Sequence, residues 1–575
     1  MDKKTVIQTL EAIATYMEIK GENTFKVSAY KKAARALETV PETLDEIDEA
    51  VKLDGIGKGT ASVIEELKAT GRSTLHDELA ASLPDGLLPL LKLPTLGGKK
   101  VGKLYQELGI TDIATLRQAC VDHKIQDMPG FGVKSEEKIL AAIEAFNTRP
   151  ERISIAVASK AADYIYEQLK KMSGIIQFEL AGSLRRVEET VKDIDWIIAT
   201  EHPEQIKDQL LQLDGIAQVI GAGDTKVSIE LGIEDLVVGV DFRLVTNGEF
   251  ASALLHFTGS KEHNVKLRQL AKERGEQVSE YGVFNKENGE TKVFETEEDF
   301  YHHFDLAYVP PEARLGKDEL VAIKDQKPYP SVADIQSDLH MHTVWSDGAH
   351  SIQEMAHAAA EKGYTHIAIT DHSQYLKVAN GLTEERLKEQ HQQIKELNNS
   401  LDIHLLTGVE MDILPDGQLD YPDEMLKDID FVIASIHSSF QQKEEVIMSR
   451  LKSALFNPHV DLIAHPTGRL IGRREGYAVN VKQLIKWAAE SGTALELNAS
   501  PQRLDLKAEW IKLAVESGVP IAINTDAHHK DRLAYIQYGV GIARKAGIPI
   551  DSIMNTWSKE RLITYLKLEK SKRFK

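Results

Sequence analysis

The spacing of apolar residues divides the chain into three regions of different character. From the start to about residue 150, apolar residues recur at helical spacing in short segments that glycine-bearing turns separate. Between about 152 and 310, strand-like runs such as 194–199 and 236–245 alternate with helical patterns, which indicates an α/β region. A stretch with prolines and charges, 324–330, predicts a linker. Beyond it, apolar runs and amphipathic helices alternate to the end, as in repeated βα units.

The length and composition limit the classes of protein. A chain of 575 residues is too long for one core, so several domains are expected. The net charge of −20 argues against a protein whose whole surface is basic. Nucleic-acid binding is still possible, because it needs only a local basic surface. Cys120 is the only cysteine, which excludes disulfides and thiolate zinc sites and fits a reducing cytoplasm. No apolar run is long enough to span a bilayer, so no membrane partner is expected.

Ligand-capable residues follow the apolar runs of the last region. Seven runs each end in histidine, aspartate, glutamate or asparagine. In a barrel of parallel strands the carboxyl ends of the strands meet at one mouth, so these side chains would converge. His340 and His342, two apart at a strand end, point to the same side and can share an ion. One histidine at a strand end is more often a hydrogen-bonded surface residue, but the recurrence at strand after strand favours a metal site.

The types of donor indicate the chemistry of this site. Imidazole and carboxylate without thiolate suit zinc, manganese or iron, and a bridging glutamate would hold two ions together. Ions in such a cluster lower the pKa of a bound water and hold phosphoryl oxygens. The sequence therefore predicts a multinuclear metal site of a phosphoester hydrolase, built from residues between His340 and His528.

The order of these residues resembles the PHP (polymerase and histidinol phosphatase) family over about residues 335 to 570. The shared motifs are His-x-His at 340–342, Thr-Asp-His at 370–372, isolated Glu410 and His437, His-Pro at 465–466 and Asp-Ala-His at 526–528. The resemblance implies a distorted (β/α)7 barrel that holds up to three Mn²⁺ or Zn²⁺ ions. It implies one metal bound by His340, His342, Glu410 and Asp526, a second by Glu410, His437 and His465, and a third by Asp347, His372 and His528.

A carboxylate pattern stands in the α/β region. Gly182-Ser183-Leu184-Arg185-Arg186 precedes Asp193-Ile194-Asp195, and strand alternation puts both aspartates on the same side. Two such carboxylates can bridge a pair of Mg²⁺ ions, which activates a 3′ hydroxyl and steadies a leaving pyrophosphate. Asp241 supplies a third carboxylate, and the Gly-Ser turn with its two arginines offers amides and charge to phosphate. An Asp-x-Asp pair alone is a weak signal, since solvated surface carboxylates are common.

The combination resembles the nucleotidyltransferase palm of family X DNA polymerases. His256-Phe257-Thr258-Gly259-Ser260, followed by Asn264 and Arg268, is similar to the YFTGS segment of polymerase beta. The resemblance implies that the catalytic, Mg²⁺-holding residues are Asp193, Asp195 and Asp241. It implies contacts with the dNTP triphosphate by Gly182, Ser183, Arg186 and Arg152, with the sugar by Phe257 and Gly259, with the base by Asn264, and with the template or the minor-groove side of the nascent base pair by Arg268. His256 replaces the usual tyrosine, which leaves ribonucleotide discrimination and fidelity open.

Three segments near the start share one form, which is a helix end, a glycine hairpin and a new helix. They are 53–59, 93–100 and 128–134, with the glycine pairs Gly55 and Gly57, Gly97 and Gly98, and Gly130 and Gly132. Glycines allow close backbone approach, and the next helix offers amides to a DNA phosphate independently of base sequence. One such turn is usually only a turn, but three copies resemble helix-hairpin-helix DNA-binding motifs.

The segment 25–35 resembles the small N-terminal domain of polymerase beta that grips a downstream 5′ phosphate. The resemblance implies a pocket of Lys26, Tyr30, Lys31 and Arg35, and the alternative is a solvated basic helix face. Val63 occupies the place of the lysine that forms a Schiff base with deoxyribose phosphate in polymerase beta. Lyase activity by that route needs a nucleophilic amine, so it is expected to be weak or absent.

Together the resemblances cover nearly the whole chain and imply a bacterial family X DNA polymerase with a C-terminal PHP domain. The expected fold is multidomain. It has α-helical helix-hairpin-helix domains at 1–85 and 86–150, an α/β nucleotidyltransferase palm at 151–245, a thumb that binds the nascent base pair at 246–318, a linker at 319–335 and the PHP barrel at 336–575.

The expected function is the filling of short gaps in DNA repair by a cytoplasmic monomer, with gapped or primed DNA and dNTPs as partners. The PHP domain would act as a metal-dependent 3′–5′ exonuclease, and the resemblance also allows cleavage at abasic sites. Two alternatives stay open for this domain: a phosphatase of small molecules, and a structural module that only binds DNA ends. The loop with Arg469, Arg473 and Arg474 is either a contact for a DNA end or a mere surface patch.

Overall fold

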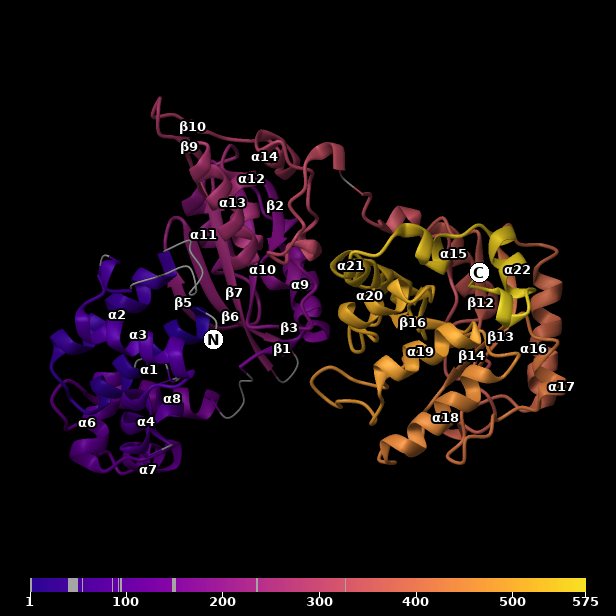
Figure 1. The fold of residues 1–575 in the computed structure, drawn as a ribbon, viewed down its shortest axis with the longest axis horizontal. Helices are drawn as coiled ribbons and strands as arrows, with labels where there is room; N and C mark the ends of the chain where they lie inside the picture. Colours follow the sequence, from indigo (N-terminus) through magenta and orange to yellow (C-terminus); the bar gives the residue numbers. More distant parts are fainter. Residues whose placement is uncertain are drawn as a thin grey trace. The chain divides into compact units, whose positions relative to one another are not determined.

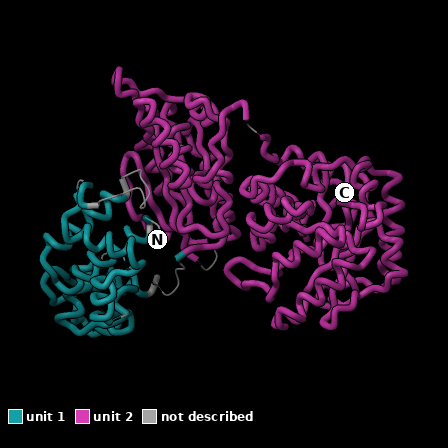
Figure 2. The backbone as a smooth tube through the Cα atoms, viewed as in Figure 1, with its two compact units in different colours: residues 1–151 teal, residues 152–575 magenta. Residues whose placement is uncertain are grey.

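The computed structural model describes residues 3–39, 50–53, 55–84, 86–91, 93, 96–146, 151–233, 236–325 and 327–574. Asp54, Pro94 and Thr95 of the expected hairpins, Gln326 of the expected linker and the expected boundaries at 85 and 150 lie outside the described residues. The chain forms two compact units, Met1–Glu151 and Arg152–Lys575 (Figure 2). The six segments expected from the sequence divide the chain more finely, and their boundaries stay predictions.

The first unit is built of short helices (Figure 1). Their bounds are α1 Lys3–Ile19, α2 Thr24–Thr39, α3 Lys58–Thr70, α4 Thr74–Ala81, α5 Leu87–Leu90, α6 Gly98–Leu108, α7 Ile113–Val121 and α8 Val133–Phe146, with a 3-10 turn at Ala50–Lys52. Helical spacing brings apolar residues of α1, among them Val6, Leu10 and Ile13, onto one buried face. One hydrophobic cluster contains residues of α1, α2, α3 and α4. A second contains Ile19, at the end of α1, and residues of α5, α6, α7 and α8.

The second unit begins with a five-stranded sheet in the order β2-β4-β7-β6-β5. Its strands are β2 Ile175–Ala181, β4 Asp193–Thr200, β5 Ile216–Ala222, β6 Lys226–Ile233 and β7 Leu236–Val245, and its helices are α9 Ile155–Leu169, α10 Gly182–Arg185, α11 Pro203–Leu210 and α12 Phe250–Thr258. Strands β4 and β7 are parallel, whereas the other pairs are antiparallel. Alternate residues of β4 enter two cores: Ile194 and Trp196 pack with α9 and α11, and Ile197 packs with α12.

A smaller helical and antiparallel region follows the sheet. It contains α13 Lys261–Glu273, β8 Glu276–Ser279, β9 Gly282–Asn285, β10 Thr291–Lys292 and α14 Glu297–His303, and 3-10 turns at Pro311–Ala313 (η3), Ile323–Asp325 and Val332–Asp334. Its three strands pair in the order β10-β9-β8. Phe300, Tyr301 and Leu267 lie in its core. A separate two-stranded ribbon, β1 Ile153–Ser154 with β3 Thr190–Val191, contacts α9.

The C-terminal region is a nearly closed barrel of seven parallel strands in sequence order. The strands are β11 Ser337–Asp338, β12 His366–Ile369, β13 His404–Asp412, β14 Phe431–Ser435, β15 Leu462–Ile463, β16 Ala494–Asn498 and β17 Ile521–Asn524. A parallel bridge between Met341 and Ala527 joins the two ends of the sheet. The barrel interior is filled by apolar side chains such as Leu406, Phe431 and Ile433. The expected seven-stranded βα barrel is confirmed.

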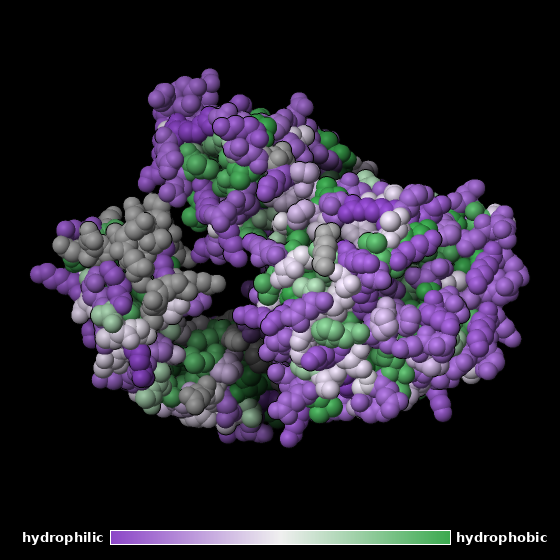
Figure 3. All heavy atoms as spheres, turned by 45° about the vertical axis from the view of Figure 1, so that its right-hand side comes forward, coloured by the Kyte–Doolittle hydropathy of each residue, from purple (hydrophilic) through white to green (hydrophobic). Residues whose placement is uncertain are grey.

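Helices surround the barrel (Figure 1). They are α15 Ile352–Glu361, α16 Glu384–Leu397, α17 Asp423–Leu426, α18 Glu444–Phe456, α19 Val481–Ser491, α20 Ala508–Glu516, α21 Ile536–Ala546 and α22 Lys559–Leu566. On the face shown in Figure 3, hydrophilic residues predominate over the surface of this region. Among the helices of the described residues, none combines the length and the apolar character that a membrane crossing needs.

Candidate functional site

Side chains predicted as metal ligands meet at the mouth of the barrel, where the carboxyl ends of the strands converge. Three groups of donor atoms each lie within 4.8 Å of one another: His342, Asp347, His372 and His528; His340, His342 and Asp526; and His372, Glu410 and His437. His465 joins them through Glu410, since its Nε2 lies 3.0 Å from Glu410 Oε1. All nine predicted ligands are therefore gathered in one site. Their division among individual ions stays a prediction.

Glu410 lies at the centre of this cluster and is 1% exposed. Its Oε2 lies 3.3 Å from His340 Nε2 and 3.0 Å from His372 Nδ1. Its Oε1 lies 3.2 Å from His437 Nε2 on the other side. The two carboxylate oxygens thus face different groups of imidazoles, which is the geometry that a bridging ligand needs.

The donor set fits metal ions. Glu410 Oε2 and His465 Nδ1 are buried and make no hydrogen bond in the described part of the chain, although imidazoles surround the carboxylate. Burial lowers the pKa of His340, but nearby carboxylates, Glu496 and Glu410 above all, outweigh it and hold that pKa well above its usual value. Protons on these imidazoles would have to leave when a cation binds, so metal affinity falls in acid.

Buried polar residues orient the predicted ligands. Glu496 Oε1 lies 2.8 Å from His340 Nδ1, and its Oε2 accepts a hydrogen bond from the amide of His465 at 2.7 Å. Asp371 accepts hydrogen bonds from the Thr343 amide at 2.8 Å and from Gln390 Nε2 at 2.6 Å, which fixes the loop after His342. Such partners set the ring orientation and basicity of metal ligands. Sequence reasoning missed Glu496, whose only signal was a carboxylate in the middle of an apolar strand.

Arginines lie beside this cluster. Arg503 Nε lies 3.5 Å from Asp526 Oδ2, with a side chain 19% exposed, and sequence reasoning had not singled it out. Arg469, by contrast, pairs with Glu189 at 2.8 Å and is buried, so its guanidinium is engaged within the protein. Arg474 lies over the ring of Phe440 at 4.2 Å. Arg503, unlike Arg469 and Arg474, therefore lies next to a predicted metal ligand, Asp526.

The second candidate site is the carboxylate cluster of the palm. The parallel register of β4 and β7 sets Asp195 directly beside Asp241, and alternation puts Asp193 on the same face of β4. Burial raises the pKa of Asp195 to about 7, and the charges of Asp193 and Asp241 add to the rise. Three carboxylates so close together repel one another when all are ionised, and bound divalent cations would stabilise the ionised forms. Lys226 Nζ lies 2.7 Å from Asp241 Oδ2 and offsets part of this charge.

The turn before β4 requires its glycine. Gly182 has φ of 66°, a left-handed conformation, and a Cβ there would collide with Asp195 Oδ2. The backbone of the Gly-Ser turn therefore lies against the carboxylate cluster. A ligand phosphate on this turn would be next to the same cluster.

Arg186 and Arg185 have different surroundings. Arg186 Nη1 donates to the carbonyl of Thr258, and a Cβ at Gly259 would lie 3.2 Å from the same nitrogen. Arg185 donates to Thr258 Oγ1 at 2.8 Å and pairs with Glu297 of α14 at 2.8 Å. The turn expected to bind triphosphate and the segment expected to bind the sugar are thus adjacent. Arg185 ties them to the thumb and is not free to supply charge to phosphate.

Replacing Glu297 with glutamine should destabilise the protein at neutral pH by about 3 kcal/mol, because it leaves the buried guanidinium of Arg314 and the half-buried one of Arg185 without their carboxylate. Glu297 is also 2.7 Å from Arg314. Burial would raise the pKa of Glu297, but Arg314 and Arg185 outweigh it and lower that pKa to about 2. The stabilisation from ionised Glu297 is complete above the pKa that this residue has in the unfolded chain. It is lost as the pH falls toward the pKa that the residue has in the folded protein. Urea unfolding at several pH values checks this, with the exposed neighbour Glu298→Gln as control. Equal stability of the two variants at pH 7 would contradict it.

The other predicted nucleotide contacts lie around this pair of segments. The Arg243 guanidinium lies over the Phe257 ring at 4.5 Å. Asn264 donates from Nδ2 to the carbonyl of His256 at 2.7 Å, while its buried Oδ1 has no hydrogen-bond partner among the described residues. Arg268 Nε donates to the carbonyl of Asn264 at 3.2 Å. Arg152 donates to Thr190 Oγ1 at 2.8 Å, on the ribbon that follows the turn. Their roles in binding a nucleotide stay predictions.

The glycines of the three predicted hairpins differ in their surroundings. Among the described residues, no atom lies within 4 Å of a Cβ added at Gly57, Gly97, Gly130 or Gly132, so this part of the chain leaves their backbones open to a ligand. A Cβ at Gly98 would lie 2.7 Å from Glu18 Oε2, so this glycine allows α6 to pack on α1. Gly55 has φ of 90° and closes the turn before α3.

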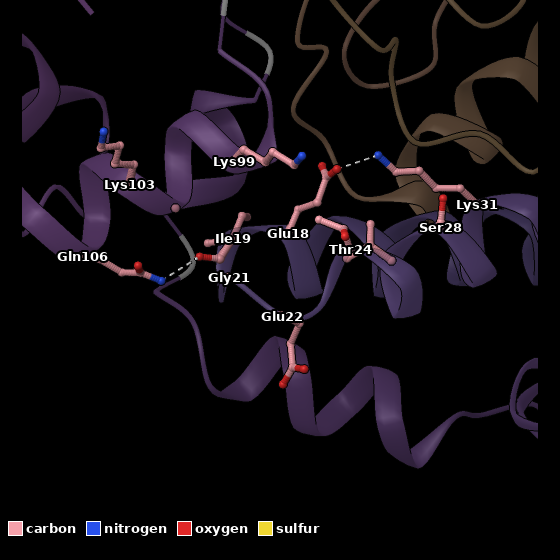
Figure 4. Close-up of a pocket in the computed structure, with 12 residues that line it drawn as sticks. Glu18, Ile19, Gly21, Glu22, Thr24, Ser28, Lys31, Lys99, Lys103 and Gln106 are labelled. Atoms are coloured by element: carbon pink, nitrogen blue, oxygen red, sulfur yellow. Dashed lines mark hydrogen bonds and ion pairs between the residues drawn. The ribbon is translucent and has the colours of Figure 1, made fainter. Parts of the chain in front are cut away.

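The predicted 5′-phosphate residues lie on α2. Lys31 Nζ is 2.9 Å from Glu18, and Figure 4 shows both side chains at a pocket of about 400 Å³ that Lys99 and Lys103 also line. Lys26 pairs with Glu22 at 3.2 Å. Two of the predicted cations therefore have acidic partners that a phosphate would have to displace. Tyr30 is mostly buried and Arg35 is exposed.

Val63 is buried in the core formed by α1 to α4. Its side chain carries no amine, and weak or absent lyase activity by the Schiff-base route stays a prediction.

Comparisons with known proteins match the same regions. A family model described as the DNA polymerase beta thumb matches residues 253–315, a PHP domain model matches 338–500, and helix-hairpin-helix models match 1–73 and 87–145. The chain is 54% identical over 568 residues to a Bacillus subtilis (strain 168) protein named DNA polymerase/3′-5′ exonuclease PolX, with 99% of this chain and 100% of that protein covered. It is 31% identical over 247 residues to a probable phosphatase of Thermoanaerobacter sp. (strain X514), with 41% of this chain and 96% of the relative covered.

These matches define a class of chain in which helix-hairpin-helix domains and a polymerase-beta-like nucleotidyltransferase are joined to a PHP phosphoesterase domain. Because the similarity to the Bacillus relative spans nearly the whole of both chains, this chain belongs to the family X DNA polymerases that carry a C-terminal PHP domain. The family and the fold class expected from the sequence are confirmed.

Proposed function

We propose that this chain fills short gaps in DNA during repair, by adding dNTPs to a primed 3′ end at the palm and removing 3′ nucleotides at the PHP site. The observation that carries the proposal is the register of Asp195 beside Asp241, directly against the Gly182 turn. The name of the Bacillus relative states both a polymerase and a 3′-5′ exonuclease. A cytoplasmic monomer acting on gapped or primed DNA fits this proposal.

In the palm, Asp193, Asp195 and Asp241 would hold Mg²⁺, which when bound neutralises the triphosphate and polarises the primer hydroxyl. Asp241 would help to take the proton from that hydroxyl. Contacts to the triphosphate would come from Gly182, Ser183, Arg186 and Arg152, contacts to the sugar from Phe257 and Gly259, and contacts to the nascent base pair from Asn264 and Arg268. The adjacency of Arg186 to Gly259 supports this arrangement, since triphosphate and sugar are neighbours in a dNTP.

The first unit would hold the DNA duplex. The open glycines Gly57, Gly97, Gly130 and Gly132 support backbone contacts with phosphates. Such contacts position the duplex without reading its sequence. The net charge of the chain, −20, does not oppose this, because the contacts are local.

At the PHP site the nine gathered side chains would hold up to three Mn²⁺ or Zn²⁺ ions, which when bound supply an activated water for attack on a phosphodiester. Glu410 would bridge, because its two oxygens face different imidazoles. Arg503 would hold a phosphoryl oxygen beside Asp526. Cleavage at abasic sites would use the same site.

A second candidate for the PHP domain is a phosphatase of small molecules, which the probable phosphatases that match this region favour. Release of label from 3′-labelled single-stranded DNA should exceed hydrolysis of p-nitrophenyl phosphate by at least about a hundredfold in kcat/KM. His340→Ala should abolish both reactions, which shows that both use the metal cluster. A preference for the phosphomonoester would favour the phosphatase, and loss of neither reaction in His340→Ala would place the activity elsewhere.

A further inference from the structure

The palm loop that follows Arg186 is held by the PHP domain. Val187 has φ of 51°, a left-handed conformation that is rare for a β-branched residue. Its side chain is buried, and its carbonyl accepts a hydrogen bond from Lys545 Nζ at 3.1 Å. Lys545 lies at the end of α21, a helix of the barrel. Contacts from another domain therefore help to fix this unusual backbone conformation.

Two glycines let α21 pack closely on both of its sides. A Cβ at Gly539 would collide with Ile523 of barrel strand β17. A Cβ at Gly541, about half a turn further around the helix, would lie 2.8 Å from Val187 Cγ2. The helix is thus confined between the barrel and the palm loop, and Lys545 has a defined position relative to that loop.

The carboxylate of Glu188 lies between two cations. Its Oε1 is 3.1 Å from Lys545 Nζ and 3.9 Å from Arg186 Nε. The Lys545 side chain is 14% exposed and that of Arg186 is 18% exposed, so water screens these charges incompletely. Both cations attract the same carboxylate oxygen, and Lys545 is the closer of the two. Its attraction therefore limits how far Glu188 neutralises the charge of Arg186.

We propose that Lys545 is a positioning residue of the polymerase site, which draws Glu188 toward the PHP domain. This leaves Nε of Arg186, whose Nη1 already donates to the Thr258 carbonyl, available for the triphosphate of the dNTP. The inference rests on the proposed function, because it takes Arg186 as a triphosphate contact. A PHP residue 358 positions along the chain from Val187 thereby sets the affinity of the palm for nucleotide. Without Lys545, Glu188 would turn to Arg186 and compete with the triphosphate.

Lys545→Met in the full chain tests this. On gapped DNA the KM for dNTP should rise about fivefold while kcat stays within about twofold, since the competition is with nucleotide binding. Adding Glu188→Gln to Lys545→Met should return the KM to within about twofold of the unchanged protein, because a neutral amide does not compete for the guanidinium.

The adjacent residue Arg544 offers a matched control. It lies 3.3 Å from Glu312 and donates to the carbonyl of Pro330 at 2.7 Å, so Arg544→Met removes contacts of the same helix without touching Glu188. This variant should leave the KM unchanged, and all of these variants should retain 3′-end degradation by the PHP site. An equal KM rise in Arg544→Met, or no rescue by Glu188→Gln, would overturn the proposal. If Arg186→Ala leaves the KM for dNTP unchanged, the proposed nucleotide site is itself wrong; if Arg186→Ala raises it but Lys545→Met does not, only this inference fails.

Discussion

Asp193→Ala is expected to reduce primer extension on gapped DNA by at least about a thousandfold while 3′-end degradation continues. The reason is the geometry of the palm, where Asp193 shares one face of β4 with Asp195, and Asp195 adjoins Asp241 on the parallel strand β7. Removing one carboxylate takes away a ligand that two Mg²⁺ ions would share. Single-turnover extension of a labelled primer in Mg²⁺ measures the effect.

The control for this variant is Asp208→Ala, which removes an exposed carboxylate from α11 of the same domain. It should extend primers at the unchanged rate. Continued extension by Asp193→Ala would show that the palm carboxylates are not the polymerase site. Loss of both extension and degradation would instead indicate a misfolded chain, which circular dichroism would detect.

The elements that carry these sites could be predicted from the sequence because their signals are local. The apolar run at 236–245 became strand β7 with the same bounds, and the seven runs that end in ligands became the seven barrel strands. A strand buried on both faces needs a continuous apolar run, and a polar residue at its end stands out against that run. The clustering of His340, Glu410 and Asp526 followed from the convergence of parallel strand ends.

The partners of those residues could not be predicted, because they depend on tertiary contacts. Arg185 and Arg186 are neighbours in the sequence, yet Arg185 pairs with Glu297 of the thumb and Arg186 lies beside Gly259. Gly98 fits the pattern of a phosphate-binding hairpin, but its α-carbon packs against Glu18. Apolar periodicity indicates which side of a helix is buried, but not which distant helix covers that side.

Residues that support a site from another strand or domain are the hardest to find from sequence. Glu496 orients His340 from β16, five strands later in the sequence, and Lys545 reaches the palm from the last third of the chain. A buried glutamate in an apolar strand was the one local signal for the first of them. Lysine at a helix end is common on surfaces, so Lys545 had no distinguishing signal at all.

Glu410→Gln is expected to reduce release of nucleotides from 3′-labelled DNA by at least about a thousandfold, with primer extension on gapped DNA preserved. Glu410 is buried, and its two oxygens face His340 and His372 on one side and His437 and His465 on the other. Burial would raise its pKa, but His437 and His340 hold that pKa well below the usual value, so the residue is an anion within the cluster. Glutamine has nearly the same shape but no charge, so the imidazoles would lose the anion that holds their ions together.

In the purified full chain carrying Glu410→Gln, the metal content measured by mass spectrometry should fall together with the nuclease activity. This measurement distinguishes a loss of bound ions from a loss of contact with the substrate. Glu424→Gln, an exposed glutamate of α17, is the matched control and should retain both. Full metal content with lost activity would assign Glu410 to substrate and not to the ions. Full activity would contradict the metal site itself. Because the two active sites share no carboxylate, the same preparation should still extend a gapped primer, and this retained reaction reports that the palm is folded.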